Sequence, residues 1–190
     1  MQDFTEISYV IDANDRLVSV SPGWTAFAVQ NQGEELTPEA MKSRLLWDFI
    51  ADETTRELYG AVLEHVRSGT PTDLILRCDA PERRRLIEMI VSLRPDGNVE
   101  FKTVLLATTT RAAQRLFAKS TPRSDRRIMV CSWCDRVNAG VEEWLEVEVA
   151  MERLHLTDEP ELPQVESVVC PGCFAKVTEI LAQSKAAATS

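Results

Sequence analysis

The sequence predicts an α+β fold: a five-stranded antiparallel sheet with helices on one face, followed by a small cysteine-containing module. Three observations predict it. Residues 5–108 carry short patterns in the order strand, strand, helix, helix, strand, strand, strand. Two C-x-x-C motifs lie near the C-terminus. A basic stretch at 109–127 separates these two regions, so we expect a linker there.

The first elements form a hairpin and a short helix. Ile7–Asp12 and Leu17–Val20 are apolar, β-rich runs on either side of a turn rich in aspartate and asparagine. Trp24–Gln30 follows Ser21-Pro22, a pair that commonly begins a helix. We therefore expect two strands and then a helix.

A longer helix is predicted over Glu53–Ser68, after the apolar run Leu45–Ile50. Asp52 is a good N-cap, and Gly69 is a suitable stop. The apolar side chains recur at helical spacing, which predicts one buried face.

Three strands complete the sheet. They are Thr72–Cys78, Arg84–Leu93 and Val99–Ala107, and Pro95-Asp96-Gly97-Asn98 is a strong hairpin turn between the last two.

The stretch 109–127 is expected to be a basic linker helix. Arg111, Arg115 and Lys119 are four residues apart, as on one face of a helix. One interpretation is a solvated basic face on a connecting helix. The other is a helix that transmits a signal or dimerises by docking on acidic patches.

Net charge and hydropathy limit the partners. The formal net charge is −9, which argues against nucleic acid or an anionic membrane as the main partner. No apolar run approaches the ~20 residues that cross a bilayer, and the first residues lack a signal-peptide pattern. We therefore expect a cytoplasmic protein whose paired cysteines are metal ligands or redox groups.

The cysteines predict one metal site. Cys131-x₂-Cys134 and Cys170-x₂-Cys173 are separated by 35 residues, and two such turns can supply four thiolates in a tetrahedron about 2.3 Å from zinc. Phe174–Gln183 reads as a helix whose dipole favours the second pair, and Val141–Leu156 reads as another amphipathic helix. We expect residues 128–185 to form a zinc-stapled helical, treble-clef-like module.

Alternatives to structural zinc remain open. C-x-x-C is also a redox motif, so the four cysteines could act as a thiol-redox or metal-responsive switch. Iron–sulfur ligation is a further option. His155 is a weaker candidate ligand, because four cysteines already complete the shell.

Residues from about Thr5 to Ala107 resemble a PAS domain. The resemblance is carried by YVIDANDRLVSVSPGW at Tyr9–Trp24, by SRLLWDFIADETTRELYGAVLEHVRSG at Ser43–Gly69, and by the meander that closes on PDGNVEFKTVLLA. It implies a role in sensing and protein–protein contact. It also implies a pocket between sheet and helices that holds haem, flavin or a small acid in some members, so a haem or flavin sensor is an alternative.

Candidate pocket residues do not match the cofactor-binding motifs of that family. The flavin-photochemical subgroup uses a cysteine in a Gly-Arg-Asn-Cys-type helix, whereas Cys78 is predicted in a strand. His65 is the one histidine in this region that could ligate haem, but its surroundings differ. Trp24 and Trp47 are expected in the core or pocket wall. Arg83, Arg84 and Arg85 could clamp a carboxylate, although a solvated turn is the simpler interpretation.

The second half is similar to a cysteine-rich tail that follows PAS or receiver domains in bacterial signalling proteins. Val130–Val137, Trp144 and Val169–Cys173 carry this similarity. The relatives read His-Gly-Ile-Cys-Pro-x-Cys where this chain reads Ser-Val-Val-Cys-Pro-Gly-Cys. The four thiolates are kept and the histidine is not.

No kinase, cyclase, helix-turn-helix, P-loop or nucleophile–base motif is evident. We therefore expect a non-enzymatic bacterial signal-transduction sensor or adaptor. Its PAS-like part would sense a small ligand or partner and would dimerise, and its zinc module would support interaction with a protein partner.

Overall fold

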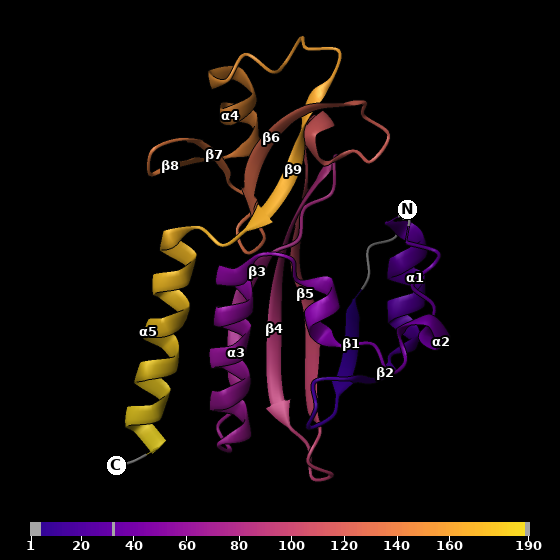
Figure 1. The fold of residues 1–190 in the computed structure, drawn as a ribbon, viewed down its shortest axis with the longest axis vertical. Helices are drawn as coiled ribbons and strands as arrows, with labels where there is room; N and C mark the ends of the chain where they lie inside the picture. Colours follow the sequence, from indigo (N-terminus) through magenta and orange to yellow (C-terminus); the bar gives the residue numbers. More distant parts are fainter. Residues whose placement is uncertain (1–4, 32, 189–190) are drawn as a thin grey trace. The chain divides into compact units, whose positions relative to one another are not determined.

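The computed structural model describes residues 5–31 and 33–188 (Figure 1). The chain divides into two compact units that alternate along the sequence. Unit 1 comprises Met1–Ile75, Ile87–Leu105 and Ala175–Ser190, and unit 2 comprises Leu76–Leu86 and Leu106–Phe174. The boundaries predicted at 5–108, 109–127 and 128–185 follow chain order, whereas these units interleave.

Unit 1 contains most of a five-stranded sheet, as predicted, and the strands lie in the order β2-β1-β5-β4-β3. β1 pairs antiparallel with both β2 and β5, and it places Tyr9 opposite Phe101. The remaining parts of three strands belong to unit 2: β3 after Ile75, β4 before Ile87 and β5 after Leu105. The strands are β1 (Glu6–Ile11), β2 (Leu17–Val20), β3 (Thr72–Arg77), β4 (Arg83–Leu93) and β5 (Val99–Thr110).

Helices α1 and α3 contact this sheet through aromatic side chains. The alternation of the strands buries one set of side chains, including Leu74 and Val91, and leaves Ile75 on the opposite face 46% exposed. Tyr59 stacks on Phe101 from α3, and Trp24 meets Tyr9 edge-on from α1. The helical segments are α1 (Pro22–Gln30), α2 (Pro38–Met41), the 3₁₀ turn η1 (Leu46–Phe49), α3 (Glu53–Arg67) and α5 (Pro171–Ala188).

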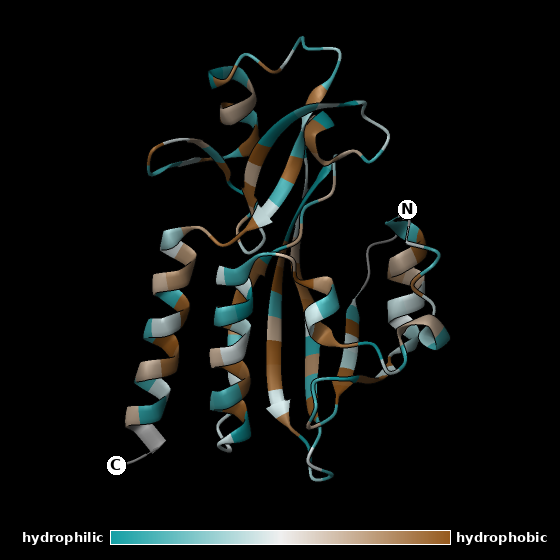
Figure 2. Cartoon of the chain, in the orientation of Figure 1, coloured by the Kyte–Doolittle hydropathy of each residue, from teal (hydrophilic) through white to brown (hydrophobic). Residues whose placement is uncertain are grey.

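α3 forms where the sequence predicts a helix. The Asp52 side chain accepts a hydrogen bond from the backbone N–H of Thr55 (2.7 Å), and Gly69 follows the end with φ of 102°. Leu58, Val62 and Val66 are buried on one face. In Figure 2, α3 carries both teal, polar and brown, apolar residues along its length, as an amphipathic helix does.

Unit 2 is a mixed sheet with one helix rather than a helical module. The order is β8-β7-β6-β9, in which β6 and β9 are parallel and the other pairs antiparallel. The helix predicted over Val141–Leu156 is wrong in its first part, which forms a hairpin, because Glu142 adopts φ of 59° and turns the chain. The elements are β6 (Arg123–Cys131), β7 (Val137–Gly140), β8 (Glu143–Leu145), α4 (Val147–Arg153) and β9 (Leu162–Val168).

The predicted basic linker helix over 109–127 is also wrong. These residues contain the end of β5, a single 3₁₀ turn η2 (Arg115–Phe117) and the start of β6. The Arg115 guanidinium donates to the carbonyl oxygens of Thr157 (3.3 Å), Glu159 (2.9 Å) and Pro160 (3.1 Å). The arginine therefore holds a loop of unit 2 instead of lining a solvated helix face.

Unit 2 has its own apolar core. Its members come from η2, the sheet, α4 and the loop after α4, so the sheet and helix enclose one cluster. They are Leu116, Ile128, Val130, Val137, Val147, Ala150, Met151, Leu156 and Leu162. No helix in the described residues is long and apolar enough to cross a membrane.

Candidate metal centre

The first cysteine pair lies in the turn between β6 and β7. Cys131 ends β6, and its backbone N–H donates to the Arg136 carbonyl (2.8 Å). The backbone N–H of Asp135 donates to the Cys131 carbonyl oxygen (2.9 Å), and Asp135 adopts φ of 56°. This tight reversal brings the side chains of Cys131 and Cys134 to the same place.

The second pair begins α5, as the sequence predicts. Cys170 immediately precedes the helix, and its Sγ accepts a hydrogen bond from the backbone N–H of Cys173 (3.4 Å). A serine oxygen makes the same contact at an N-cap. Pro171 occupies the first helical position, where its missing N–H costs nothing. Both sulfurs therefore lie at the positive end of the helix dipole.

The four sulfurs converge. The Sγ atoms of Cys131, Cys134, Cys170 and Cys173 all lie within 4.8 Å of one another, and those of Cys134 and Cys170 are 3.8 Å apart. Four sulfurs at about 2.3 Å from zinc in a tetrahedron are about 3.8 Å from each other. The arrangement therefore fits a tetrahedral metal ion with little movement.

The four neighbouring thiols affect one another's ionisation. Hydrogen bonds from Cys134 and Cys173, and from two backbone N–H groups, lower the pKa of Cys131 to about 2. The pKa of Cys134 rises to about 12, chiefly through its hydrogen bond to Cys131, and the pKa of Cys173 also rises. One thiol ionises readily, and its negative charge then disfavours ionisation of the neighbouring thiols. A divalent metal ion removes this conflict, because it stabilises all four thiolates together.

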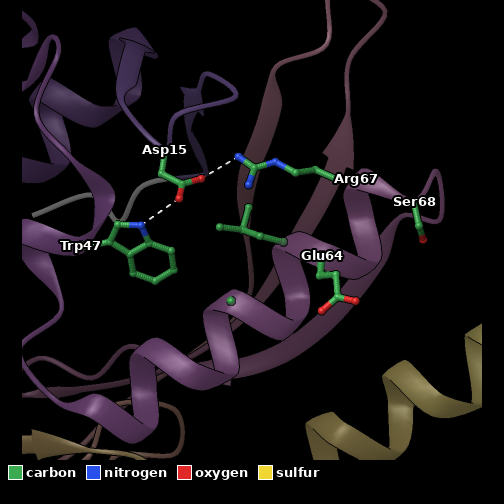
Figure 3. A pocket seen from close by; sticks show the side chains of 7 residues that line it. Asp15, Trp47, Glu64, Arg67 and Ser68 are labelled. Carbon is green, nitrogen blue, oxygen red and sulfur yellow. Dashed lines mark hydrogen bonds and ion pairs between the residues drawn. The ribbon is translucent and has the colours of Figure 1, made fainter.

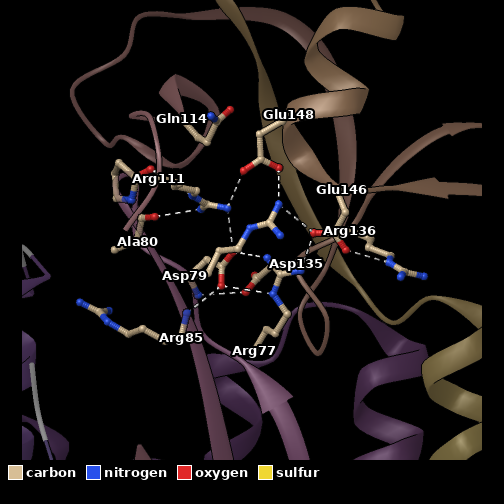
Figure 4. A network of polar contacts seen from close by, with 12 residues as sticks. Arg77, Asp79, Ala80, Arg85, Arg111, Gln114, Asp135, Arg136, Glu146 and Glu148 are labelled. Carbon is tan, nitrogen blue, oxygen red and sulfur yellow. Dashed lines mark hydrogen bonds and ion pairs between the residues drawn. The ribbon is translucent and has the colours of Figure 1, made fainter. Parts of the chain in front are cut away.

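A buried ionic network supports the first turn (Figure 4). The backbone N–H of Asp79 donates to the Asp135 carboxylate (2.9 Å), and the Trp133 carbonyl accepts from the backbone N–H of Arg77 (2.9 Å). The Asp79 side chain is fully buried and pairs with Arg77 and with Arg111 (2.9 Å). The chain around Cys134 is thereby held by the end of β3.

Glutamates of α4 and of its N-cap continue this network. Glu146 pairs with Arg77 (2.6 Å) and Arg136 (3.2 Å), and Glu148 pairs with Arg84 (2.6 Å). Burial raises the pKa of Asp135 to about 6. Asp79, Asp135 and Glu146 could not be predicted from the sequence, because partners so far apart in the chain leave no local pattern.

The other candidate residues lie outside the cysteine cluster. Cys78 is not among the four, and burial raises the pKa of its thiol to about 11. His155 is exposed with φ of 54° and does not join the cluster. The solvated turn expected for the three arginines is wrong, since Arg85 is 2% exposed and Arg84 pairs with Glu148 of this chain.

Aromatic side chains fill part of the space between sheet and helices in unit 1. Tyr9 stacks on Phe101 with ring centroids 4.7 Å apart, and Phe101 has no exposed surface. Burial raises the pKa of Tyr59 to about 12. His65 is buried as well. Its Nε2 lies 3.1 Å from Ser184 Oγ of α5, so this ring nitrogen already has a partner within the protein.

A groove of about 500 Å³ lies along α3 (Figure 3). Trp47 donates from Nε1 to Asp15 (2.8 Å), and the same carboxylate pairs with Arg67 (2.6 Å). Gly60 and Leu63 contribute the helix side of the groove. Trp47 therefore lines the groove, as expected for a pocket-wall residue. Trp24 donates from its Nε1 to the Leu36 carbonyl oxygen (2.9 Å).

Several solved structures are similar to this chain. No family model and no curated protein matches the chain. A solved domain of the sensory box sensor histidine kinase/response regulator from Geobacter sulfurreducens is 15% identical, with a TM-score of 0.35. The match covers 52% of this chain and 82% of that one.

Proposed function

We propose that this chain is a non-enzymatic signal-transduction sensor or adaptor that holds one structural zinc ion at Cys131, Cys134, Cys170 and Cys173. The observation that carries the proposal is the convergence of four sulfurs within 4.8 Å from two separate turns. Backbone N–H groups directed at the sulfurs, such as Cys170 N–H to Cys131 Sγ (3.3 Å), support it. Such bonds stabilise thiolate charge around a metal.

Zinc suits this site better than other metals. Four thiolates in a closed tetrahedral shell are the usual ligand set of structural zinc, with no open position for a substrate. Cys131 and Cys170 are buried, and the other two cysteines are half-buried. The bound ion would join the β6–β7 turn to the start of α5, which stabilises a unit with a small apolar core.

The sensing part of the proposal rests on unit 1. Its five-stranded sheet agrees with the sheet expected from the PAS resemblance. In this proposal unit 1 receives a small ligand or a protein partner, the chain acts in the bacterial cytoplasm as a homodimer, and it binds neither nucleic acid nor membrane. The net charge of −9 supports the last point.

Metal content and visible absorbance of one untagged sample test the proposal. We expect about one zinc per chain and no colour. Cys134→Ser should lose most of the metal, whereas Cys78→Ser should keep it, because Cys78 lies outside the cluster.

Other results would overturn parts of the proposal. Visible absorption with iron would replace zinc by an iron–sulfur centre, and a haem or flavin spectrum would move the function to unit 1. Absence of metal, with four thiols that titrate freely, would replace the zinc site by a thiol switch.

A further inference from the structure

The groove along α3 is built from three segments of unit 1. Trp47 of η1 and Asp15 of the turn between β1 and β2 lie on one side, and the helix forms the other (Figure 3). Leu63 is 2% exposed and gives the helix side an apolar surface. The volume of about 500 Å³ lies within the range of about 300–1,000 Å³ that is usual for small-molecule sites. The groove is therefore large enough for a small ligand.

Hydrogen bonds hold the side of the groove that carries Trp47. The backbone N–H of Leu46 donates to the Asp15 carbonyl oxygen (2.9 Å), which joins η1 to the β1–β2 turn. The Arg56 guanidinium of α3 donates to the Trp47 carbonyl oxygen (2.9 Å), which joins η1 to the helix. A ligand therefore meets a preformed surface, and binding costs less conformational entropy than on a surface that must be ordered.

Gly60 leaves space on the helix side of the groove. A Cβ at this position would meet nothing within 4 Å, so no close approach of other atoms requires glycine here. Glycine also lowers the stability of a helix relative to alanine. The missing side chain leaves room for a flat apolar group between the helix and Trp47.

The groove carries two acidic side chains and one basic one. Both carboxylate oxygens of Asp15 are engaged, one by Trp47 Nε1 and the other by Arg67 Nη2. Within residues 5–31 and 33–188, the Arg67 side chain makes its hydrogen bonds through Nη2 alone, so Nε and Nη1 keep donors for another acceptor. Glu64 is exposed and lines the same groove three residues before Arg67, a spacing that places both on one face of α3.

These charges restrict the class of ligand. Asp15 and Glu64 against Arg67 give the groove a formal charge of −1, so a ligand with only a negative charge would be repelled. A ligand with only a positive charge would leave the Arg67 donors unused. A zwitterion satisfies both groups, because its carboxylate can accept from the guanidinium and its ammonium can pair with Glu64.

From these observations we propose that the groove binds a free α-amino acid with a flat, apolar side chain. The carboxylate contacts Arg67, the ammonium contacts Glu64, and the side chain lies between Trp47 and the gap at Gly60. The inference rests on the sensing part of the proposed function and deepens it, because it names a site and a ligand class for unit 1.

Isothermal titration calorimetry of the full chain with four related compounds tests the ligand class. L-Phenylalanine carries all three recognised groups, whereas 3-phenylpropanoate lacks the ammonium, 2-phenylethylamine lacks the carboxylate and L-alanine lacks the ring. We expect each of these three to bind at least about tenfold more weakly than L-phenylalanine, because each loses a charged hydrogen bond or the apolar contact. Equal affinity for L-phenylalanine and any of the three overturns the inference, as does no binding of L-phenylalanine at millimolar concentration.

Three variants place the binding in the groove. Gly60→Leu should fold, because its side chain enters open space and leucine favours a helix, and it should weaken L-phenylalanine binding by at least about tenfold by filling the groove. Thr54→Leu, at an exposed position of α3 outside the groove, is the matched control and should leave binding unchanged. Glu64→Gln should weaken binding of L-phenylalanine and should not weaken binding of 3-phenylpropanoate.

The zinc content of the same samples separates this inference from the proposed function. A chain that holds zinc and binds none of the four compounds loses the inference and keeps the metal centre. L-Phenylalanine that binds equally to the wild type and to Gly60→Leu lies elsewhere, which overturns the groove and leaves a sensing role standing. Binding that Gly60→Leu abolishes in a chain without zinc would overturn the metal centre alone.

Discussion

Two glycines show how much a single Cβ atom matters in unit 1. A Cβ at Gly23, in the first turn of α1, would lie 2.4 Å from the Glu6 carbonyl oxygen. A Cβ at Gly60, within α3, would meet nothing within 4 Å. Glycine is therefore required at the first position and costs stability at the second.

We expect Gly23→Ala to destabilise the protein by about 1–3 kcal/mol, because the backbone of β1 must move. Gly60→Ala is the matched control and should stabilise by about 0.5–1 kcal/mol through its higher helix propensity. Urea unfolding of both variants measures these changes. Equal effects at the two positions would contradict the close approach between Gly23 and Glu6.

Asp79 is the residue on which the ionic network of unit 2 depends. Its side chain is fully buried between Arg77 and Arg111, and Arg111 is itself 7% exposed. Removing one partner of a buried ion pair leaves the other charge uncompensated.

Asp79→Ala should therefore lower the free energy of unfolding by about 3–5 kcal/mol. Asp125 is exposed, so Asp125→Ala is a control that should change stability little. Denaturant titration compares the two. A small effect at Asp79 would mean that solvent enters the network and screens these charges.

At the scale of elements, α3 and α5 meet through a buried histidine. Burial, with a smaller contribution from Lys185, lowers the pKa of His65 below its ordinary value of 6.5. Its Nδ1 is buried and has no hydrogen-bond partner among the described residues. The folded chain therefore favours the neutral imidazole, whereas the unfolded chain takes up a proton more readily.

The sign of the pH dependence follows from this lowered pKa. The stabilising contribution is fully present above about pH 6.5 and is lost as the pH falls below that value. His65→Gln should remove this part of the pH dependence, and His155→Gln, at an exposed position, should keep it. Unfolding free energies between pH 5 and pH 7.5 measure it. Stability that rises as the pH falls would contradict the buried neutral histidine.

Most elements of unit 1 could be predicted, because their signals are local. Asp52 begins α3 and Pro95-Asp96-Gly97-Asn98 joins β4 to β5, as expected. The prediction of a linker helix was wrong because basic residues four apart are not specific to a solvated helix face. Arg115 instead binds a carbonyl group far along the chain. The four clustered cysteines could be predicted from their spacing. The contacts of Asp79 and Glu146 with the neighbouring chain form only when the chain folds.

At the scale of the whole molecule, metal removal should affect the two units differently. A chelator that strips zinc should raise amide hydrogen exchange in the β6–β7 turn and the first turn of α5. Exchange in β1 and β2 of unit 1 should change less. Cys134→Ser should reproduce the pattern without chelator, and Cys78→Ser should not. Uniform loss of protection would show that both units depend on the ion.

The interleaving of the two units limits how their parts can be exchanged or inherited. Unit 1 is assembled from three separate stretches of chain and unit 2 from two. A fragment that ends at Phe174 retains all four cysteines but loses Ser184, the contact of His65. A fragment that begins at Leu106 also retains the cysteines but loses Arg77 and Asp79. No single proteolytic cut, and no fusion at one point in the gene, separates these units intact, so recombination would transmit them together.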